Sequence, residues 1–187
     1  DIEKIQHGNP SGADNTVSTY GGFIQYKKTS KNKFHNLDIK ESLPLWIINT
    51  GKPDESTREM VELVKHLFYK TPNRVKRILR RMETVSDHFL RFLLNKDQAS
   101  LRDLIKENEL LLEKLGVVSP YVMRLVRKIE QIGGAAKITG AGGVKSKSGM
   151  VLTYHPDPQV LKEFAQNEKL NIFSVHLGEE GVKDETN

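Results

Sequence analysis

Residues 135–154, AAKITGAGGVKSKSGMVLTY, set the architecture of the second half of this chain. Two short apolar runs, 135–138 and 150–154, flank a glycine-rich loop at 139–143. Runs of this length between glycines predict buried strands, and their order predicts a β-hairpin. The loop lacks the Gly-Lys-Ser/Thr ending of a P-loop. Its N–H groups could bind an anion, although an isolated glycine loop is more often a simple turn.

The segments around this hairpin predict a mixed α+β domain. A helix at 158–166 and a strand at 171–177 follow the hairpin, and an apolar strand begins at residue 43. The order is therefore strand, helices, strand, strand, helix, strand. This is a ferredoxin-like (split βαβ) plan with added helices in the first crossover. We expect one domain over 43–187, with a frayed tail after Gly178.

The first crossover reads as four helices. Pro72 breaks the first apolar stripe of helical spacing, and Gly116 ends a later one. Ser119, which precedes a proline, is a typical helix start. At the entry to the first helix, either Ser56 or Thr57 can serve as the N-cap.

Residues 8–22, GNPSGADNTVSTYGG, carry the clearest chemical content. The pattern predicts a short helix at 10–19, a strand at 23–27, and a hairpin tip or exposed loop at 29–41. Asp14 stands among small polar residues near the helix start. Its carboxylate could accept a proton from a substrate hydroxyl, or it could simply stabilise the helix as an acid in the first turn.

The composition is that of an ordinary globular chain of 187 residues, 37% hydrophobic and 28% charged. The net charge of +5 favours anionic partners such as nucleotides or nucleic acid. Much of the excess lies at 70–81, which we interpret as a solvated helix face. The absence of cysteine excludes a disulfide framework and a thiol nucleophile, and it fits a cytoplasmic protein. No apolar run approaches the ~20 residues of a membrane span.

Three segments together resemble the GHMP kinase superfamily and, within it, the mevalonate kinases. They are residues 5–22, the turn at 49–58 (NTGKPDESTR), and 137–143 (KITGAGG). The first is typical of mevalonate kinases, whereas the third is shared across the superfamily. The resemblance implies the end of a GHMP kinase N-terminal domain at 1–42, followed by the C-terminal domain at 43–187.

The resemblance further implies an ATP-dependent kinase that uses Mg²⁺ and phosphorylates the 5-hydroxyl of mevalonate in isoprenoid biosynthesis. Asp14 would be the catalytic residue, either as the base or as the group that orients the nucleophile. Glu3 would bind the metal ion. The implied substrate-binding residues are His7, Asn9, Ser11, Gly12, Thr57 (or its neighbour Ser56), Gly140 and Ala141, and the implied nucleotide-binding residues are Gly140 and Gly142.

The sequence departs from the family pattern in several places. The family's main phosphate loop and an early catalytic lysine are absent, so the resemblance implies a missing N-terminal half, without which the fragment would be inactive. One extra residue precedes Thr57. After Gly143, the stretch 144–148 (VKSKS) replaces a glycine-rich continuation. We expect 144–148 to form a longer exposed turn, although Lys145 and Lys147 could instead contact anions.

Other functions remain open at this point. Within the superfamily they are a phosphomevalonate kinase, a galactokinase-like enzyme or a mevalonate-derived decarboxylase. A nucleic-acid-binding module is the alternative outside it, suggested by the basic helix. It is disfavoured because 135–138 has no aromatic residue on which bases could stack, and 150–154 has only Tyr154. No membrane partner is expected, and a homodimer is compatible with the resemblance.

Overall fold

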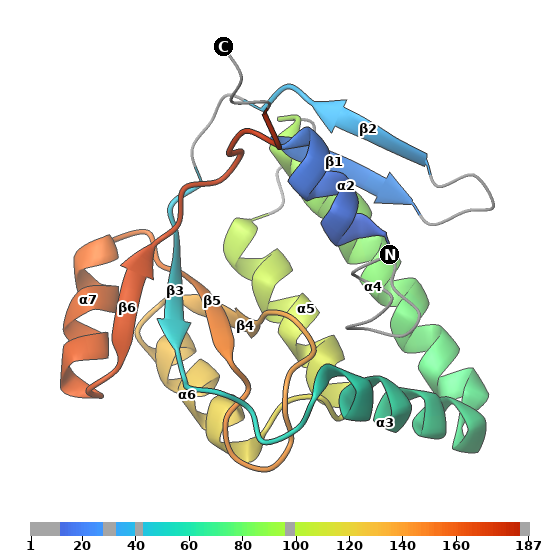
Figure 1. Cartoon of the computed structure of the whole chain (residues 1–187). Coiled ribbons are helices and arrows are strands. Elements are labelled where there is room, and N and C mark those ends of the chain that lie inside the picture. Colours follow the sequence, from blue (N-terminus) through green and yellow to red (C-terminus); the bar gives the residue numbers. More distant parts are fainter. Residues whose placement is uncertain (1–11, 28–32, 40–42, 96–99, 184–187) are drawn as a thin grey trace. The chain divides into compact units, whose positions relative to one another are not determined.

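The structure is a computed structural model that describes residues 12–27, 33–39, 43–95 and 100–183 (Figure 1). Contacts divide the chain into two compact units. One lies within residues 1–43 and 176–187, and the other is Pro44–Val175.

The larger unit is built on one four-stranded antiparallel sheet. In spatial order its strands are β4 (Ala135–Ile138), β5 (Met150–Tyr154), β3 (Leu45–Asn49) and β6 (Asn171–Ser174). This order is that of the ferredoxin-like plan, so the predicted fold class is confirmed. The last strand ends at Ser174, three residues earlier than predicted.

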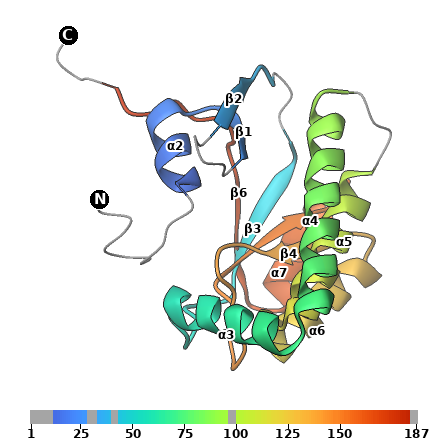
Figure 2. The same ribbon diagram turned by 90° about the vertical axis from the view of Figure 1, so that its right-hand side faces the viewer.

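The helices of this unit follow the predicted order. They are α3 (Thr57–Lys70), α4 (Pro72–Leu93), α5 (Leu101–Leu115) and α6 (Pro120–Gln131) in the first crossover, and α7 (Pro158–Asn167) in the second. Figure 2 shows α3 lying across the end of the long helix α4. The change of direction falls at Pro72, whose ring cannot continue a helix from the preceding turn.

Local sequence signals explain where these helices begin and end. Ser56 caps α3 in a capping box, since its hydroxyl accepts from the N–H of Glu59 and the Glu59 carboxylate accepts from the N–H of Ser56. Ser119 caps α6 through the N–H of Val122. Gly116 ends α5 in the left-handed conformation, which glycine adopts without steric cost.

The two faces of the sheet pack against different helices. The core cluster includes Ile48, Ala136, Ile138 and Val151 from the strands, with partners from α6 and α7: Val122, Val126, Ile129 and Leu161. Because side chains alternate along a strand, Leu45, Lys137 and Leu152 belong to the opposite face. That face meets α4 and α5.

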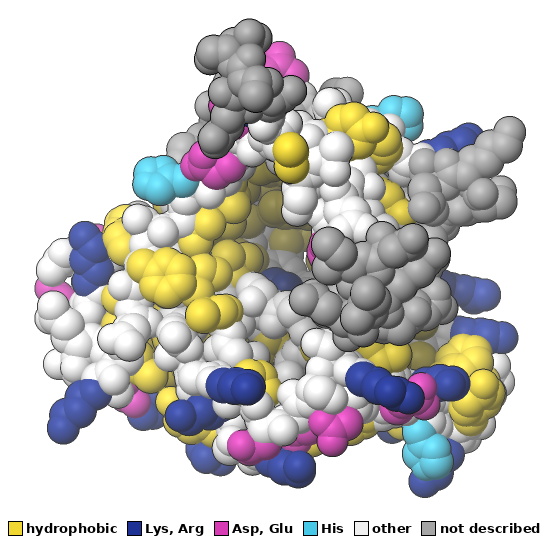
Figure 3. Space-filling model, in the orientation of Figure 1, with side chains coloured by type: hydrophobic (Ala, Val, Ile, Leu, Met, Phe, Trp, Pro, Cys, Tyr) yellow, Lys and Arg dark blue, Asp and Glu magenta, His cyan; other side chains and the backbone are white. Residues whose placement is uncertain are grey.

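The basic stretch at 70–81 behaves as a solvated helix face. Val75 and Ile78 are its buried residues, and its arginines and lysines are exposed. Lysine and arginine side chains gather over α3 and the adjacent end of α4, with carboxylates among them (Figure 3). One of these arginines, Arg81, pairs with Glu107 of α5. The charge there is therefore partly compensated within the domain.

The smaller unit contains α2 (Ala13–Tyr20) and an antiparallel hairpin of β1 (Phe23–Lys27) and β2 (Lys33–Leu37). Of the two alternatives for 29–41, a hairpin tip or an exposed loop, the structure shows the hairpin, and its second strand begins at Lys33 within that range. The rings of Tyr20 and Phe34 are 4.5 Å apart between centroids and join the helix to the hairpin.

The expectation of a frayed tail after Gly178 was wrong for the residues described there. Glu180 forms a β-bridge with Gly21, and the N–H of Gly22 donates to the carbonyl of Glu179 at 2.8 Å. The N–H of Val182 donates to Ser18 at 3.0 Å. Backbone hydrogen bonds of this kind need no apolar side chains. The polar sequence of the tail therefore contained no pattern that would predict this pairing.

A fully buried carboxyl group lies between α5 and β4. Oε2 of Glu109 accepts from the N–H of Ile138 at 2.9 Å, and Oε1 has no hydrogen-bond partner among the described residues. Burial raises the pKa of Glu109 from its ordinary 4.5 to about 7. The neighbouring Lys137, whose pKa is lowered by burial, donates to the carbonyl of Ile138 at 2.8 Å.

This carboxyl group should make the domain less stable as the pH rises. Between pH 4.5 and 7 the folded state keeps a proton on Glu109 that the unfolded chain has released. The free energy of unfolding should therefore fall by about 2–3 kcal/mol between pH 5 and pH 8. In denaturant unfolding, Glu109→Gln should lack this decrease of the unfolding free energy with pH. Glu163→Gln, on the exposed surface of α7, should retain it. Equal slopes in all three proteins would contradict the assignment.

Candidate functional site

A pocket of about 300 Å³ lies between the turn that enters α3 and the connection from β4 to β5. Both segments belong to the larger unit. The turn contributes Glu55, Ser56 and Thr57, and the connection contributes Thr139, Ala141 and Gly142. The fold thus brings Thr57, Ala141 and Gly142, three residues predicted from the sequence, to one cavity from opposite ends of the first crossover.

The glycine loop is held at its two ends and carries free backbone N–H groups between them. Thr139 N–H donates to Met150 and Gly143 N–H donates to Val117, which fixes both ends of the loop. Between them, the N–H groups of Gly140, Ala141 and Gly142 have no acceptor among the described residues. Successive free N–H groups in a glycine-rich turn attract a negatively charged ligand. Open space lies where a side chain on Gly140 would stand.

The hydroxyls of Ser56 and Thr57 have different local roles. The Ser56 hydroxyl donates to Oε2 of Glu59 at 2.8 Å and accepts from the Glu59 N–H, so it is committed to the cap. The hydrogen bond from the Ser56 N–H, and to a smaller extent the one from its hydroxyl, lowers the pKa of Glu59. Thr57 is the first residue of α3 and lines the pocket. The geometry therefore favours Thr57 over Ser56 as the hydroxyl available to a ligand.

The two local departures from the family pattern contact each other. Oε1 of Glu55 accepts from the N–H of Lys145 at 3.1 Å, and the Ser146 hydroxyl donates to Asp54 at 2.6 Å. The turn is exposed at 145–147, as predicted. It is nevertheless held in place, since Ser119 donates to the Ser146 carbonyl at 2.7 Å.

Glu55 and Ser148 are among the lining residues of this pocket that were not predicted as site residues. Glu55 has a buried carboxylate oxygen, Oε2, which finds no hydrogen-bond partner in the part of the chain that the structure describes. Ser148 is buried, and its hydroxyl donates to the carbonyl of Gly143 at 3.1 Å. The sequence offered only the extra residue before Thr57 and the replaced stretch at 144–148 as signals. Neither feature revealed that the two segments meet.

Asp14 lies in the first turn of α2 in the smaller unit, where its side chain is exposed. Gly12 precedes the helix with φ +85°, a left-handed conformation, and its carbonyl accepts from Thr16. Both roles considered for Asp14 are compatible with this position. Of the other predicted residues, Glu3, His7, Asn9 and Ser11 lie outside the described residues.

The described residues contain neither a cluster of metal-binding side chains nor a membrane-spanning helix. Within 12–27, 33–39, 43–95 and 100–183, no group of three or more His, Asp or Glu side chains is placed to hold a metal ion. Within the same ranges, no helix has the length and apolar character needed to cross a bilayer.

Comparison with known proteins agrees with this geometry. The model of the family described as "GHMP kinases C terminal" matches residues 89–144, which run from α4 to the glycine loop. The chain carries a GHMP kinase C-terminal domain. The glycine loop of the pocket is therefore part of the segment shared with this family.

The curated relatives of this GHMP kinase domain are mevalonate kinases. The mevalonate kinase of Gibberella zeae is 33% identical over 199 residues, which cover 96% of this chain and 38% of the relative. That of Pyrococcus horikoshii is 36% identical over 148 residues, which cover 76% of this chain and 43% of the relative. The chain is homologous to these enzymes and spans about two fifths of their length.

Solved structures show the same fold. The L. major mevalonate kinase in complex with R-mevalonate matches with a TM-score of 0.76 and 24% identity, over 94% of this chain and 55% of that one. A phosphomevalonate kinase from Streptococcus pneumoniae and a mevalonate diphosphate decarboxylase from Enterococcus faecalis each match with a TM-score of 0.59. Each of the three is at most 24% identical to this chain, so these likenesses concern the fold.

Proposed function

We propose that this chain is part of a mevalonate kinase, an enzyme that transfers the γ-phosphoryl group of ATP to the 5-hydroxyl of mevalonate. The observation that carries the proposal is the pocket in which Thr57 faces the glycine loop at 139–143. Homology to mevalonate kinases supports the choice of substrate.

The pocket supplies the elements that phosphoryl transfer needs from this domain. The transition state spreads negative charge over the phosphoryl oxygens, so positioned N–H donors stabilise it. The free N–H groups of Gly140, Ala141 and Gly142 are such donors. The Thr57 hydroxyl can hold the acceptor near them, and exposed Lys52 at the rim adds a positive charge.

The remaining roles are assigned from the resemblance. Asp14 takes the proton of the mevalonate 5-hydroxyl or orients that hydroxyl for attack, and Glu3 binds Mg²⁺ that accompanies the nucleotide. His7, Asn9, Ser11 and Gly12 contact the substrate. Cytoplasmic location and a homodimer belong to the same proposal.

The test is an acceptor profile of the intact protein. With ATP and Mg²⁺, mevalonate should be phosphorylated with a higher kcat/KM than phosphomevalonate, galactose or mevalonate diphosphate. Thr57→Ala should raise the KM for mevalonate, and Thr71→Ala, at the far end of α3, should not. Preference for an already phosphorylated acceptor would move the assignment to a phosphomevalonate kinase or a decarboxylase.

A further inference from the structure

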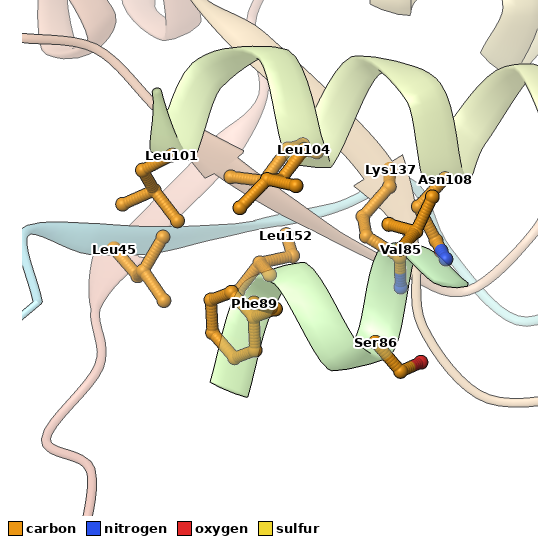
Figure 4. Close-up of a pocket in the computed structure, with 10 residues that line it drawn as sticks. Leu45, Val85, Ser86, Phe89, Leu101, Leu104, Asn108, Lys137 and Leu152 are labelled. Carbon is orange, nitrogen blue, oxygen red and sulfur yellow. The ribbon is translucent and has the colours of Figure 1, made fainter. Parts of the chain in front are cut away.

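A second cavity, of about 260 Å³, lies on the opposite side of the sheet from α6 and α7. It is a half-open pocket bounded by the sheet face and by α4 and α5, and it shares no lining residue with the pocket described above. Its walls are apolar: Leu45 and Leu152 from the sheet, Phe89 from α4, and Leu101 and Leu104 from α5 (Figure 4). An apolar cavity with a few polar groups is the usual form of a small-molecule site.

The polar groups of this cavity gather at one end. Figure 4 shows Ser86, Asn108 and Lys137 together there, with Leu45 and Leu101 at the other end. The lining is therefore amphipathic along its length. A ligand that fits it has an aliphatic body and one polar head.

The polar end carries a positive charge that is incompletely paired. The Lys137 ammonium can donate three hydrogen bonds, and one goes to the carbonyl of Ile138 at 2.8 Å. The charge of Glu109 acts on Lys137, but the Glu109 carboxyl group already accepts from the N–H of Ile138. Burial has partly removed the Lys137 ammonium from water. The carboxylate of a ligand at this end would give it a hydrogen-bonded counter-charge.

We propose that this pocket binds a small monocarboxylate with an aliphatic tail, its carboxylate on Lys137 and its tail along the leucines and Phe89. The cavity lies just below the roughly 300–1,000 Å³ of drug-sized ligand pockets, so the tail is short. The head is a singly charged carboxylate, because Lys137 is the one cation among the described residues that line the pocket. This site is separate from the proposed kinase chemistry and does not depend on it.

The charge of Glu109 gives the site a pH dependence. Glu109 faces Lys137 on β4, Glu113 on its own helix and Arg127 on α6. When Glu109 is ionised it competes with the ligand for Lys137, and when it is protonated it does not. Affinity for an anion should therefore increase as the pH falls from 8 to 6, a range in which a simple carboxylic acid remains ionised.

The test is an NMR titration of the intact protein with hexanoate, in the absence of ATP and mevalonate. Hexanoate should shift resonances of residues on α4, α5 and β5 that line the cavity. Hexanol, which has the tail without the charge, and acetate, which has the charge without the tail, should each bind at least about tenfold more weakly. Hexanoate should bind more tightly at pH 6 than at pH 8.

Variants separate binding at this site from general effects on the fold. Lys137→Met should weaken hexanoate binding about tenfold or more, while Lys114→Met, on the exposed surface of α5, should leave it unchanged. Because loss of a buried lysine can disturb folding, Ser86→Leu provides a second variant that fills the polar end from an exposed position on α4. It should abolish binding with an unchanged melting temperature. Absence of binding to the parent protein, or equal binding of hexanol and hexanoate, would overturn the proposal.

Discussion

Asp14→Asn in the intact protein is expected to lower kcat for mevalonate phosphorylation by roughly 10²–10⁴-fold, the usual contribution of a positioned acid–base group. Asparagine keeps the size and most hydrogen bonds of the side chain but can neither accept the proton nor carry the charge. The KM values for ATP and mevalonate should change far less than kcat, since the loss falls on the transition state. Steady-state kinetics with both substrates varied measures the split.

The control for this prediction is Asp103→Asn. Asp103 is likewise an exposed aspartate in the first turn of a helix, α5, and no catalytic role is proposed for it. If Asp14 served only to stabilise the N-terminus of α2, both variants would lose at most about 1 kcal/mol of stability and keep their turnover. Normal kcat in Asp14→Asn would remove this residue from the chemistry.

Gly142→Ala is expected to destabilise the larger unit far more than Gly140→Ala. Both glycines have positive φ, +79° and +69°, which alone costs an alanine about 1–2 kcal/mol. At Gly142 the added Cβ would also overlap the carbonyl oxygen of Val117 and lie 2.8 Å from Cδ1 of Ile138. At Gly140 the added Cβ would have no atom of the described residues within 4 Å, apart from those of its own chain neighbours. The total loss for Gly142→Ala should therefore exceed about 3 kcal/mol.

Denaturant unfolding of the two alanine variants checks this difference directly. The pair is matched, because both positions lie in one loop, bear the same substitution and carry a similar backbone strain. Gly140→Ala should remain folded while narrowing the opening to the free N–H groups. Equal free energies of unfolding for the two variants would show that the loop can move away from Val117, against the close packing described here.

Much of the fold follows from patterns that neighbouring residues make among themselves. Ser56, Pro72, Gly116 and Ser119 mark helix ends through bonds or steric limits within a few residues, so their roles could be predicted. The pairing of the tail at 178–183 and the extent of strand β2 within the predicted hairpin were not foreseen, because both depend on backbone hydrogen bonds that leave no apolar alternation to detect.

The candidate site was also predictable only in part, because contacts between residues far apart in the sequence leave no local pattern. Thr57, Ala141 and Gly142 belong to recognisable turns, and they do share a cavity. Their neighbours Glu55 and Ser148 gave no local signal. The bond from Lys145 to Glu55 joins residues 90 positions apart, and such a pairing is specified by packing of the whole domain rather than by either segment.

The chain order of helices and strands, the caps and the glycine loop are properties of short stretches, and the amino acids there specify them without help from distant residues. Burial of Glu109 beside Lys137 is a different kind of property. It requires α5 to pack on β4, so that residues 29 positions apart form a hydrogen bond away from water. The raised pKa of Glu109 and the charged end of the second cavity exist because the folded domain, and no local pattern, removes these groups from solvent.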